Sequence, residues 1–151
     1  MSRNLQSVLS TTETSPVSIA LIRLLVGAVF LAEGIQKFLF SDALGVGRFI
    51  KIGIPAPEIM APFVGIVETV GGILLLIGLF TRPAAVALII DMIVAISTTK
   101  IPMLIESGFW TMAHEARTDW SMLLGSIVLL ILGAGKWSVD WRIARRNPSQ
   151  K

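Results

Sequence analysis

Four stretches of apolar residues, separated by shorter and more polar segments, dominate the pattern of the chain. The first, residues 17–40, has 24 residues, which span about 36 Å at about 1.5 Å per helical residue, enough to cross the hydrocarbon core of a bilayer. The other three cover residues 58–80, 83–99 and 119–137. The pattern predicts an all-α protein, an integral membrane four-helix antiparallel bundle with interfacial loops on its outer side, formed by residues 17–141. Cytoplasmic tails, 1–16 and the basic 142–151, are expected to flank this domain.

The first stretch carries its charges on one side. At 100° per helical residue, Arg23, Phe30, Glu33 and Lys37 fall within an arc of about 80°. A charge near the bilayer centre costs about 2.5 to 3.5 kcal/mol, so this face must contact protein or a polar cavity rather than lipid. Glu33 and Lys37 could simply neutralise each other, and Arg23 could extend to the nearer surface. An ionisable residue inside a membrane is equally a mark of function.

The second and third stretches each carry one acidic residue near the middle of a face of small residues, Glu68 and Asp91. From their depths in an antiparallel bundle, we expect Arg23 to reach Asp91, and Lys37 to reach Glu68 or Glu33. Three carboxylates then face two bases. At least one carboxyl group is expected to be protonated or to meet a further base from the outer loop.

Two segments are too polar to span a membrane and are expected at its surface. Residues 41–57 alternate apolar with basic or glycine residues, which indicates an interfacial loop with one amphipathic turn. Residues 100–118 are expected to lie in the interface or to fold back into it. The latter segment contains His114 and Arg117, which could fold in toward the excess carboxylate. A lone histidine is also often only an interfacial cap.

Composition places the chain among membrane proteins, because 54% of the residues are hydrophobic and 15% are charged. The net charge is +3, but the basic residues are not clustered on a soluble face, so no nucleic-acid partner is expected. Of the Lys and Arg residues next to the predicted spans, seven lie on the side of the two termini and four lie on the other side. The positive-inside rule therefore predicts a multi-pass protein of the bacterial inner (plasma) membrane with both termini in the cytoplasm.

The chain has no cysteine and one histidine. The missing thiols exclude a disulfide, a thiolate metal site, an iron–sulfur cluster or a dithiol redox centre carried by this chain. One histidine excludes a haem held by two histidines of a single copy. No metal-ligand spacing, phosphate loop or serine nucleophile motif is present, so any redox chemistry needs a borrowed or diffusible carrier.

Several short motifs occur in a recognisable order. They are Arg23, Gly27, Gly34 and Lys37, then Gly53-Ile-Pro55, then Glu68 with Gly71-Gly72 and Gly78, then His114-Glu-Ala-Arg-Thr-Asp119, and last Gly133-Ala-Gly-Lys-Trp-Ser-Val-Asp140. In this order the chain resembles the DoxX family of small four-helix bacterial membrane proteins. The resemblance implies a protein described as an oxidoreductase or a subunit of one. The family's name comes from a terminal oxidase and thiosulfate:quinone oxidoreductase system, and a role in oxidative-stress complexes has been proposed for mycobacterial relatives.

The family has no agreed set of catalytic residues, so the residue roles expected here follow from the bundle. The first hypothesis is a quinone-interacting subunit of a membrane oxidoreductase system, with no intrinsic cofactor, in which Glu68 and Asp91 exchange protons as the catalytic pair. Arg23 would make a structural ion pair. The quinone headgroup would be held by Glu33, Lys37, Trp110, His114, Arg117 and Asp119.

Two other functions remain open from the sequence. The protein could be a non-enzymatic membrane partner or scaffold whose charges are structural, or a carrier of a small solute or of protons through the same carboxylates. The expected partners are the lipid bilayer, a membrane or soluble redox protein, and further copies of the chain as a homo-oligomer. The absence of a cofactor motif favours the scaffold, and the excess of carboxylates favours the other two.

Overall fold

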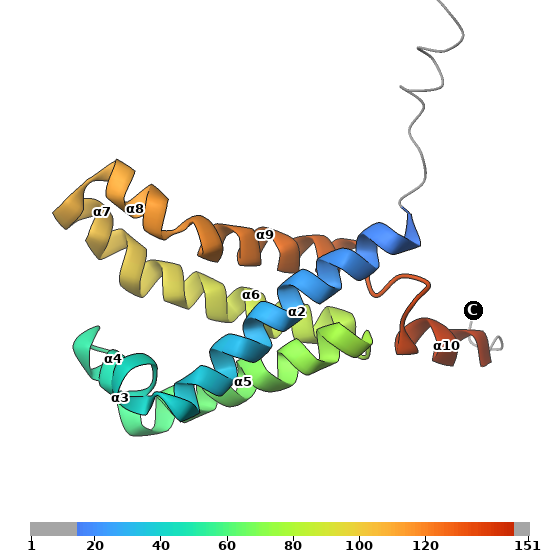
Figure 1. The fold of residues 1–151 in the computed structure, drawn as a ribbon, viewed down its shortest axis with the longest axis horizontal. Coiled ribbons are helices and arrows are strands. Elements are labelled where there is room, and N and C mark those ends of the chain that lie inside the picture. Colours follow the sequence, from blue (N-terminus) through green and yellow to red (C-terminus); the bar gives the residue numbers. More distant parts are fainter. Residues whose placement is uncertain (1–14, 147–151) are drawn as a thin grey trace, which may run out of the picture.

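Four long helices lie side by side in the computed structural model, which describes residues 15–146 (Figure 1). They are α2 (Pro16–Leu39), α5 (Pro57–Ile77), α6 (Thr81–Ala95) and α9 (Arg117–Leu132). Helix α2 packs against α5 and α9, and α6 packs against the same two helices from the opposite side. The described range contains no β-strand. The predicted all-helical membrane fold is confirmed.

Three stretches are long and apolar enough to span a membrane: Pro16–Leu39, Pro57–Ile77 and Thr81–Ser107, with mean hydropathies of 2.0, 2.1 and 1.9. The third is longer than predicted, because α6 continues through a π-helical turn, η1 (Ile96–Lys100), into α7 (Ile101–Ser107). The predicted fourth helix, 119–137, is shorter, since α9 has 16 residues and stops at Leu132. The chain turns there because Gly133 adopts a φ of +74°, which L side chains rarely allow.

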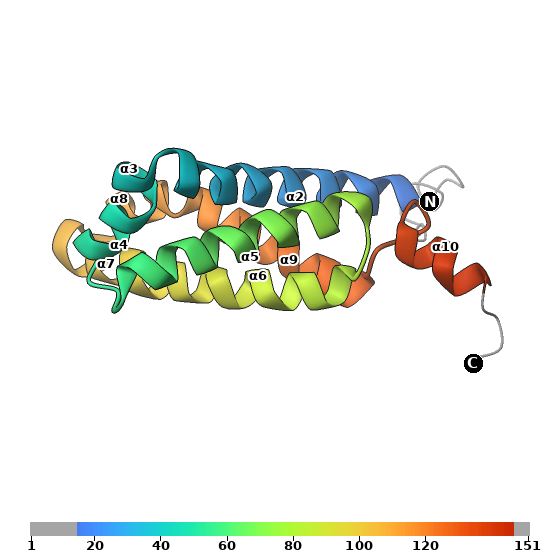
Figure 2. The same cartoon turned by 90° about the horizontal axis from the view of Figure 1, so that it is seen from below.

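The two predicted interfacial segments are helical rather than loops. Residues 41–57 contain α3 (Ser41–Leu44) and α4 (Val46–Lys51), and the end of 100–118 contains α8 (Phe109–Glu115). These short helices gather at one end of the molecule (Figure 1). At the other end, α10 (Val139–Arg146) lies near the start of α2 (Figure 2). The described part of the chain therefore has more helices than the four predicted.

Helices α2 and α5 approach closely because glycines face each other. A Cβ atom on Gly72 would lie 2.6 Å from the backbone nitrogen of Leu31 and 2.7 Å from the carbonyl oxygen of Gly27. Small residues of this kind let transmembrane helices make close backbone contact. Elsewhere a buried core that includes Val26, Phe30, Leu75, Leu88 and Leu129 fills the space between the helices. Apolar side chains also cover the outside, as expected of surfaces that face lipid.

Arg23 does not pair with Asp91, which corrects the expectation from the sequence. Its buried guanidinium instead donates to four backbone carbonyls, those of Leu75 and Leu76, each at 2.9 Å, and of Ala134 and Trp137, each at 2.8 Å. The first two belong to the last turn of α5, where helix carbonyls have no partner within the helix. Arg23 thus joins α2, the end of α5 and the segment that precedes α10.

Asp140 makes a second junction at the same end. Its carboxylate accepts from the backbone N–H groups of Phe80 and Thr81, at 2.9 and 3.1 Å, and so caps the start of α6. The predicted basic tail, 142–151, is in part helical in the structure, because residues up to Arg146 belong to α10. Of the predicted tails, residues 1–14 and 147–151 lie outside the described residues.

Candidate functional site

A cavity of about 370 Å³ lies between the long helices, at the end of the molecule that carries α3, α4 and α8. Its apolar wall includes Phe30 from α2, Phe49 from α4 and Met122 from α9. The charged residues that line it are Glu33, Lys37, Arg48, Glu68, Asp91, Lys100, Glu115 and Asp119. Five of these, Glu33, Lys37, Glu68, Asp91 and Asp119, are predicted site residues, so the structure brings them together around one space.

A buried ion pair joins the two helices that pack most closely. The Nζ atom of Lys37 lies 2.5 Å from Oε2 of Glu68, and the two side chains are 12% and 4% exposed. Lys37 stands in the last turn of α2, and Glu68 stands on the glycine-rich face of α5. The predicted contact between Lys37 and Glu68 is therefore present. Glu33, the other proposed partner of Lys37, lines the cavity but is exposed.

Asp91 completes an acidic cluster around the same lysine. It comes from α6 and is a neighbour of both Glu68 and Lys37. Its Oδ2 atom is buried and accepts no hydrogen bond. A buried polar atom without a partner costs about 1 to 3 kcal/mol, so such atoms in native proteins call for an explanation. Here the atom lies beside a cavity, where a proton, a water or a ligand could satisfy it.

A second ion pair lines the same cavity. Lys100 Nζ lies 3.1 Å from Oδ2 of Asp119, and it also donates to the carbonyl oxygen of Glu115 at 3.3 Å. Lys100 is 9% exposed, and it is the last residue of the π-helical turn η1. Single π-helical turns inside α-helices often occur at functional sites. Here the turn ends with a lysine that lines the cavity.

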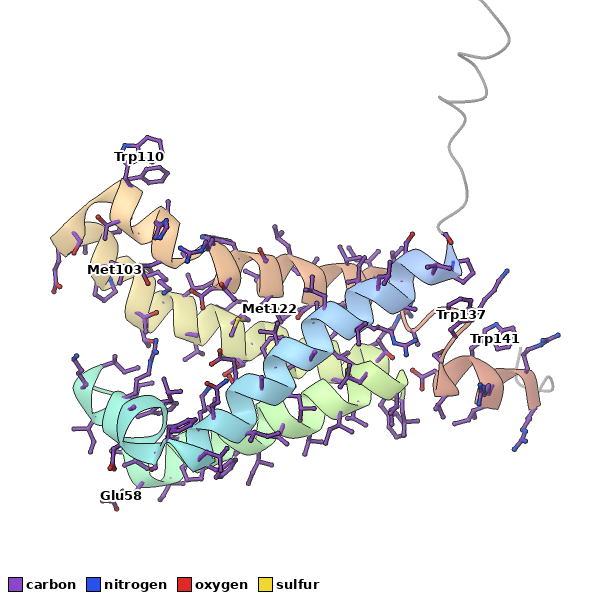
Figure 3. The ribbon with its side chains drawn as sticks, viewed as in Figure 1. Glu58, Met103, Trp110, Met122, Trp137 and Trp141 are labelled. Atoms are coloured by element: carbon purple, nitrogen blue, oxygen red, sulfur yellow. The ribbon has the colours of Figure 1, made fainter. Side chains whose placement is uncertain are left out.

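Three residues expected to hold a quinone lie outside the cavity wall: Trp110, His114 and Arg117. Trp110 is 83% exposed and projects away from the long helices (Figure 3). His114 and Arg117 are exposed, and the guanidinium of Arg117 donates to the carbonyl oxygen of His114. The reason is local, because residues 109–115 form a helix that packs on α7 and α9 instead of folding inward.

The sequence reasoning missed two cavity cations, Arg48 and Lys100. Both were assigned to interfacial segments because these segments are too polar to span a membrane. For Arg48 the sequence did offer a sign of packing, because its neighbour Phe49 is an aromatic residue in an otherwise glycine-rich stretch. In the structure Phe49 is buried, at 6% exposure. Phe49 is the buried residue of α4, and α4 packs on α5.

The fold and the cavity together define a class: a helical membrane protein with a charged, partly buried cavity near one end of its spans. Comparison with known proteins makes this more specific. The chain belongs to the DoxX family, whose model, described as DoxX, matches residues 18–101.

Two of the similar relatives are membrane proteins by name, and a third is named an oxidoreductase. The chain is 56% identical over 137 residues to the uncharacterized membrane protein Rv3486 of Mycobacterium tuberculosis, covering 87% of this chain and 84% of the relative. It is 31% identical over 120 residues to a Bacillus subtilis protein named "Putative oxidoreductase CatD", covering 80% and 82%. It is 29% identical over 135 residues to the inner membrane protein YphA of Escherichia coli, covering 84% and 91%. No solved structure matches the chain.

Proposed function

We propose that the cavity binds the headgroup of a quinone, and that the protein is a quinone-interacting subunit of an inner-membrane oxidoreductase system. The observation that carries the proposal is the cluster of Lys37, Glu68 and Asp91, in which Lys37 pairs with Glu68, Asp91 lies beside this pair, and Asp91 Oδ2 is buried without a hydrogen-bond partner. The name of the Bacillus subtilis relative, an oxidoreductase, supports the direction of the proposal.

The size and lining of the cavity suit such a ligand. Its volume of about 370 Å³ is within the range of small-molecule sites, which are mostly apolar with a few placed polar groups. A quinone ring can pack on apolar side chains such as Phe30 and Met122. Its two carbonyl oxygens accept hydrogen bonds, and the two lysines that line the space, Lys37 from α2 and Lys100 from η1, are the proposed donors, one for each oxygen.

Reduction of a quinone to its quinol consumes two electrons and two protons, one proton for each oxygen. Glu68 and Asp91 are the groups from which protons could be transferred, since a carboxyl group can donate a proton and then recover one. The electrons must come from a partner protein that carries a redox group, because the chain has no cysteine and no binding motif for such a group.

Compared with the expectation from the sequence, the proposed ligand set changes in two ways. Lys100 and Arg48 replace Trp110, His114 and Arg117, because only the former pair lines the cavity. Glu33, Lys37 and Asp119 remain in the proposed quinone-binding set, and Asp119 acts by holding Lys100. Residues that hold a ligand through other residues should affect affinity more weakly than those in contact with it.

One observation favours a different function, that of a membrane partner without catalysis. Arg23 and Asp140 are charged groups at the other end of the bundle whose hydrogen bonds are fully explained by helix-end packing. The pair of Lys37 and Glu68 could likewise serve only to join α2 to α5. A carrier of protons or of a small solute would use the same carboxyl groups. The test must therefore separate binding and turnover from folding.

The test uses the purified chain in lipid nanodiscs and a water-soluble ubiquinone analogue with a short tail. Glu68→Gln and Asp91→Asn keep side-chain shape while changing the acid–base group. Glu58→Gln is the matched control, because Glu58 lies on the same helix as Glu68, is exposed and points outward (Figure 3). Binding is followed by quenching of tryptophan fluorescence, and melting temperatures report folding.

We expect saturable quinone binding by the unaltered chain and by Glu58→Gln, with affinity lowered about tenfold or more in Glu68→Gln and Asp91→Asn, the loss typical of one buried charged hydrogen bond. In membrane vesicles, quinone-linked activity should fall in a well-folded Glu68→Gln variant. If the unaltered chain binds no quinone, or if the folded Glu68→Gln variant keeps full binding and activity, the redox role is refuted and the membrane-partner function is adopted.

A further inference from the structure

A second site lies at the opposite end of the molecule, and we infer that it binds the headgroup of an anionic phospholipid. It is a shallow groove of about 640 Å³ between the turn that joins α5 to α6, the end of α9 and the start of α10. Arg82, Lys136 and Trp141 line it, together with Thr81, Ser138 and Asp140. None of these residues belongs to the quinone cavity proposed above.

The charge of the groove suits an anion. Arg82 and Lys136 are exposed, and one guanidinium nitrogen of Arg82 is held by the carbonyl oxygen of Ile131 at 3.3 Å. The carboxylate of Asp140 is also in the lining, but both of its oxygens accept backbone N–H groups from the start of α6. Both of its oxygens are thus occupied, and it forms no ion pair with Arg82 or Lys136, whose charges are left to meet a ligand.

A buried hydroxyl group adds an independent mark of a ligand. Thr81 is 1% exposed, and its Oγ1 atom has no hydrogen-bond partner. A hydroxyl both donates and accepts, so a phosphate oxygen in the groove would satisfy it. The N–H groups of Phe80 and Thr81 at the start of α6 are already capped by Asp140. Recognition of an anion in the groove is therefore assigned mainly to side chains.

The neighbouring helix α10 extends the positive surface. It carries Arg142, Arg145 and Arg146, all exposed, and the guanidinium of Arg145 stacks at 4.6 Å on the ring of Trp141. Trp137 and Trp141 are at this same end of the molecule (Figure 3). Tryptophan and basic residues together are typical of the layer where helices leave the hydrocarbon and meet headgroups.

The position of the groove favours a lipid over a soluble anion. The groove lies where the apolar helices α5, α6 and α9 begin or end, so a headgroup bound there would leave its acyl chains along their exposed apolar surfaces. Arg23 of α2 donates to the carbonyls of Ala134 and Trp137 in the loop before α10, and Asp140 at the start of α10 accepts from the start of α6. The basic residues are thus presented on a fixed surface.

Delipidated protein in detergent is titrated with phosphatidylglycerol or with phosphatidylcholine, and the bound lipids are counted by native mass spectrometry. The test variant is Arg82→Gln/Lys136→Gln. The control variant, Lys51→Gln/Arg117→Gln, removes the same charge at the other end, and Arg117 also donates to a backbone carbonyl. Thr81→Val removes the hydroxyl and keeps the shape. A further titration adds excess inorganic phosphate.

We expect preferential binding of phosphatidylglycerol by the unaltered chain. Each cation removed from the groove should lower this affinity about fivefold, so the double variant should lose about 25-fold, while the control variant changes by less than about twofold. Thr81→Val should lose about fivefold. Should the double variant fail to fold, Thr81→Val and Lys136→Gln alone carry the test.

Three results would overturn the inference. The first is equal affinity for the two lipids, and the second is an equal loss in the control and test variants. The third is displacement of the lipid by inorganic phosphate at comparable concentration, which would show a site for free phosphate rather than for a lipid headgroup. A failure of quinone binding has no bearing on these outcomes, because the two sites share no residue.

Discussion

Replacing Arg23 with methionine should be the most destabilising single change at the α10 end of the molecule. Methionine retains an unbranched apolar side chain and removes every donor. Four backbone carbonyls, of Leu75, Leu76, Ala134 and Trp137, would then lose a hydrogen bond at once. Two of these carbonyls end α5, and the other two belong to the loop that leads to α10.

The magnitude follows from the number of bonds. Hydrogen bonds between side chains inside membrane proteins average about 0.6 kcal/mol and reach about 1.7 kcal/mol, so four bonds correspond to about 2 to 7 kcal/mol. The donor is charged and 5% exposed, which favours the upper half of this range. Arg23→Lys should recover only part of the loss, because an ammonium group has three donors and lacks the planar shape that spans separate carbonyls.

The assay is unfolding of purified protein in mixed micelles, followed by far-ultraviolet circular dichroism as the denaturing detergent is increased. The control is Arg142→Met, which removes an exposed arginine from α10 at the same end and should change stability by about 1 kcal/mol or less. If Arg23→Met and Arg142→Met unfold at the same detergent fraction, the four hydrogen bonds do not stabilise the fold and the reasoning is refuted.

Four further predictions concern other parts of the molecule. Lys37→Ala should lower the free energy of unfolding by about 3 to 5 kcal/mol, because it leaves Glu68 without its partner, whereas the control Lys51→Ala should lower it by about 0 to 1 kcal/mol. Equal melting temperatures of the two variants would contradict burial of the pair. Gly72→Ala should cost about 1 to 3 kcal/mol, since its methyl group would meet the α2 backbone, whereas Ala28→Val adds bulk on an exposed face and should be nearly neutral in the same melt. Asp140→Ala removes a cap from α6 and should cost about 0.5 to 2 kcal/mol, with a smaller loss in Asp140→Asn. Reporter fusions at each end should place both termini in the cytoplasm, and an external C-terminus would contradict the positive-inside count.

Hydrophobic periodicity was sufficient to predict the helices that depend on it alone. The first predicted stretch, 17–40, differs from α2 by one residue at each end, because Pro16 suits a first helical position and the Ser15 hydroxyl accepts from the backbone of Val17 at 3.3 Å. The predicted small-residue face of the second helix is buried, Glu68 included. Both results follow because polar groups within the hydrocarbon core of a bilayer must be satisfied by contacts inside the protein.

Polar pairings were harder to predict, because depth along a helix gives no information about competing partners. Arg23, expected in the inner third of the bundle, was matched with Asp91, expected near the middle, as the opposite charge within its reach. Such a comparison of charges leaves out the carbonyl oxygens at the end of α5, which lie 2.9 Å from the guanidinium. Carbonyls in the last turn of a helix have no N–H partner one turn further on, and that of Leu75 accepts only from the capping N–H of Gly78, at 3.2 Å, besides Arg23. A backbone acceptor at a helix end can therefore displace a carboxylate as the partner of a buried arginine.

The position of Lys100 has a geometric cause. In a regular α-helix the nine residues from Asp91 to Lys100 rotate by 900°, which leaves the two side chains about 180° apart. The π-helical turn at 96–100 accommodates about one extra residue, so the angle falls to about 80° and both side chains can reach the same cavity. Hydrophobic period does not encode such a turn, and a helical wheel applied beyond Ala95 assigns Lys100 to the wrong face. The second ion pair of the cavity, and with it the donor proposed for the far side of a quinone, therefore depends on a single irregular turn.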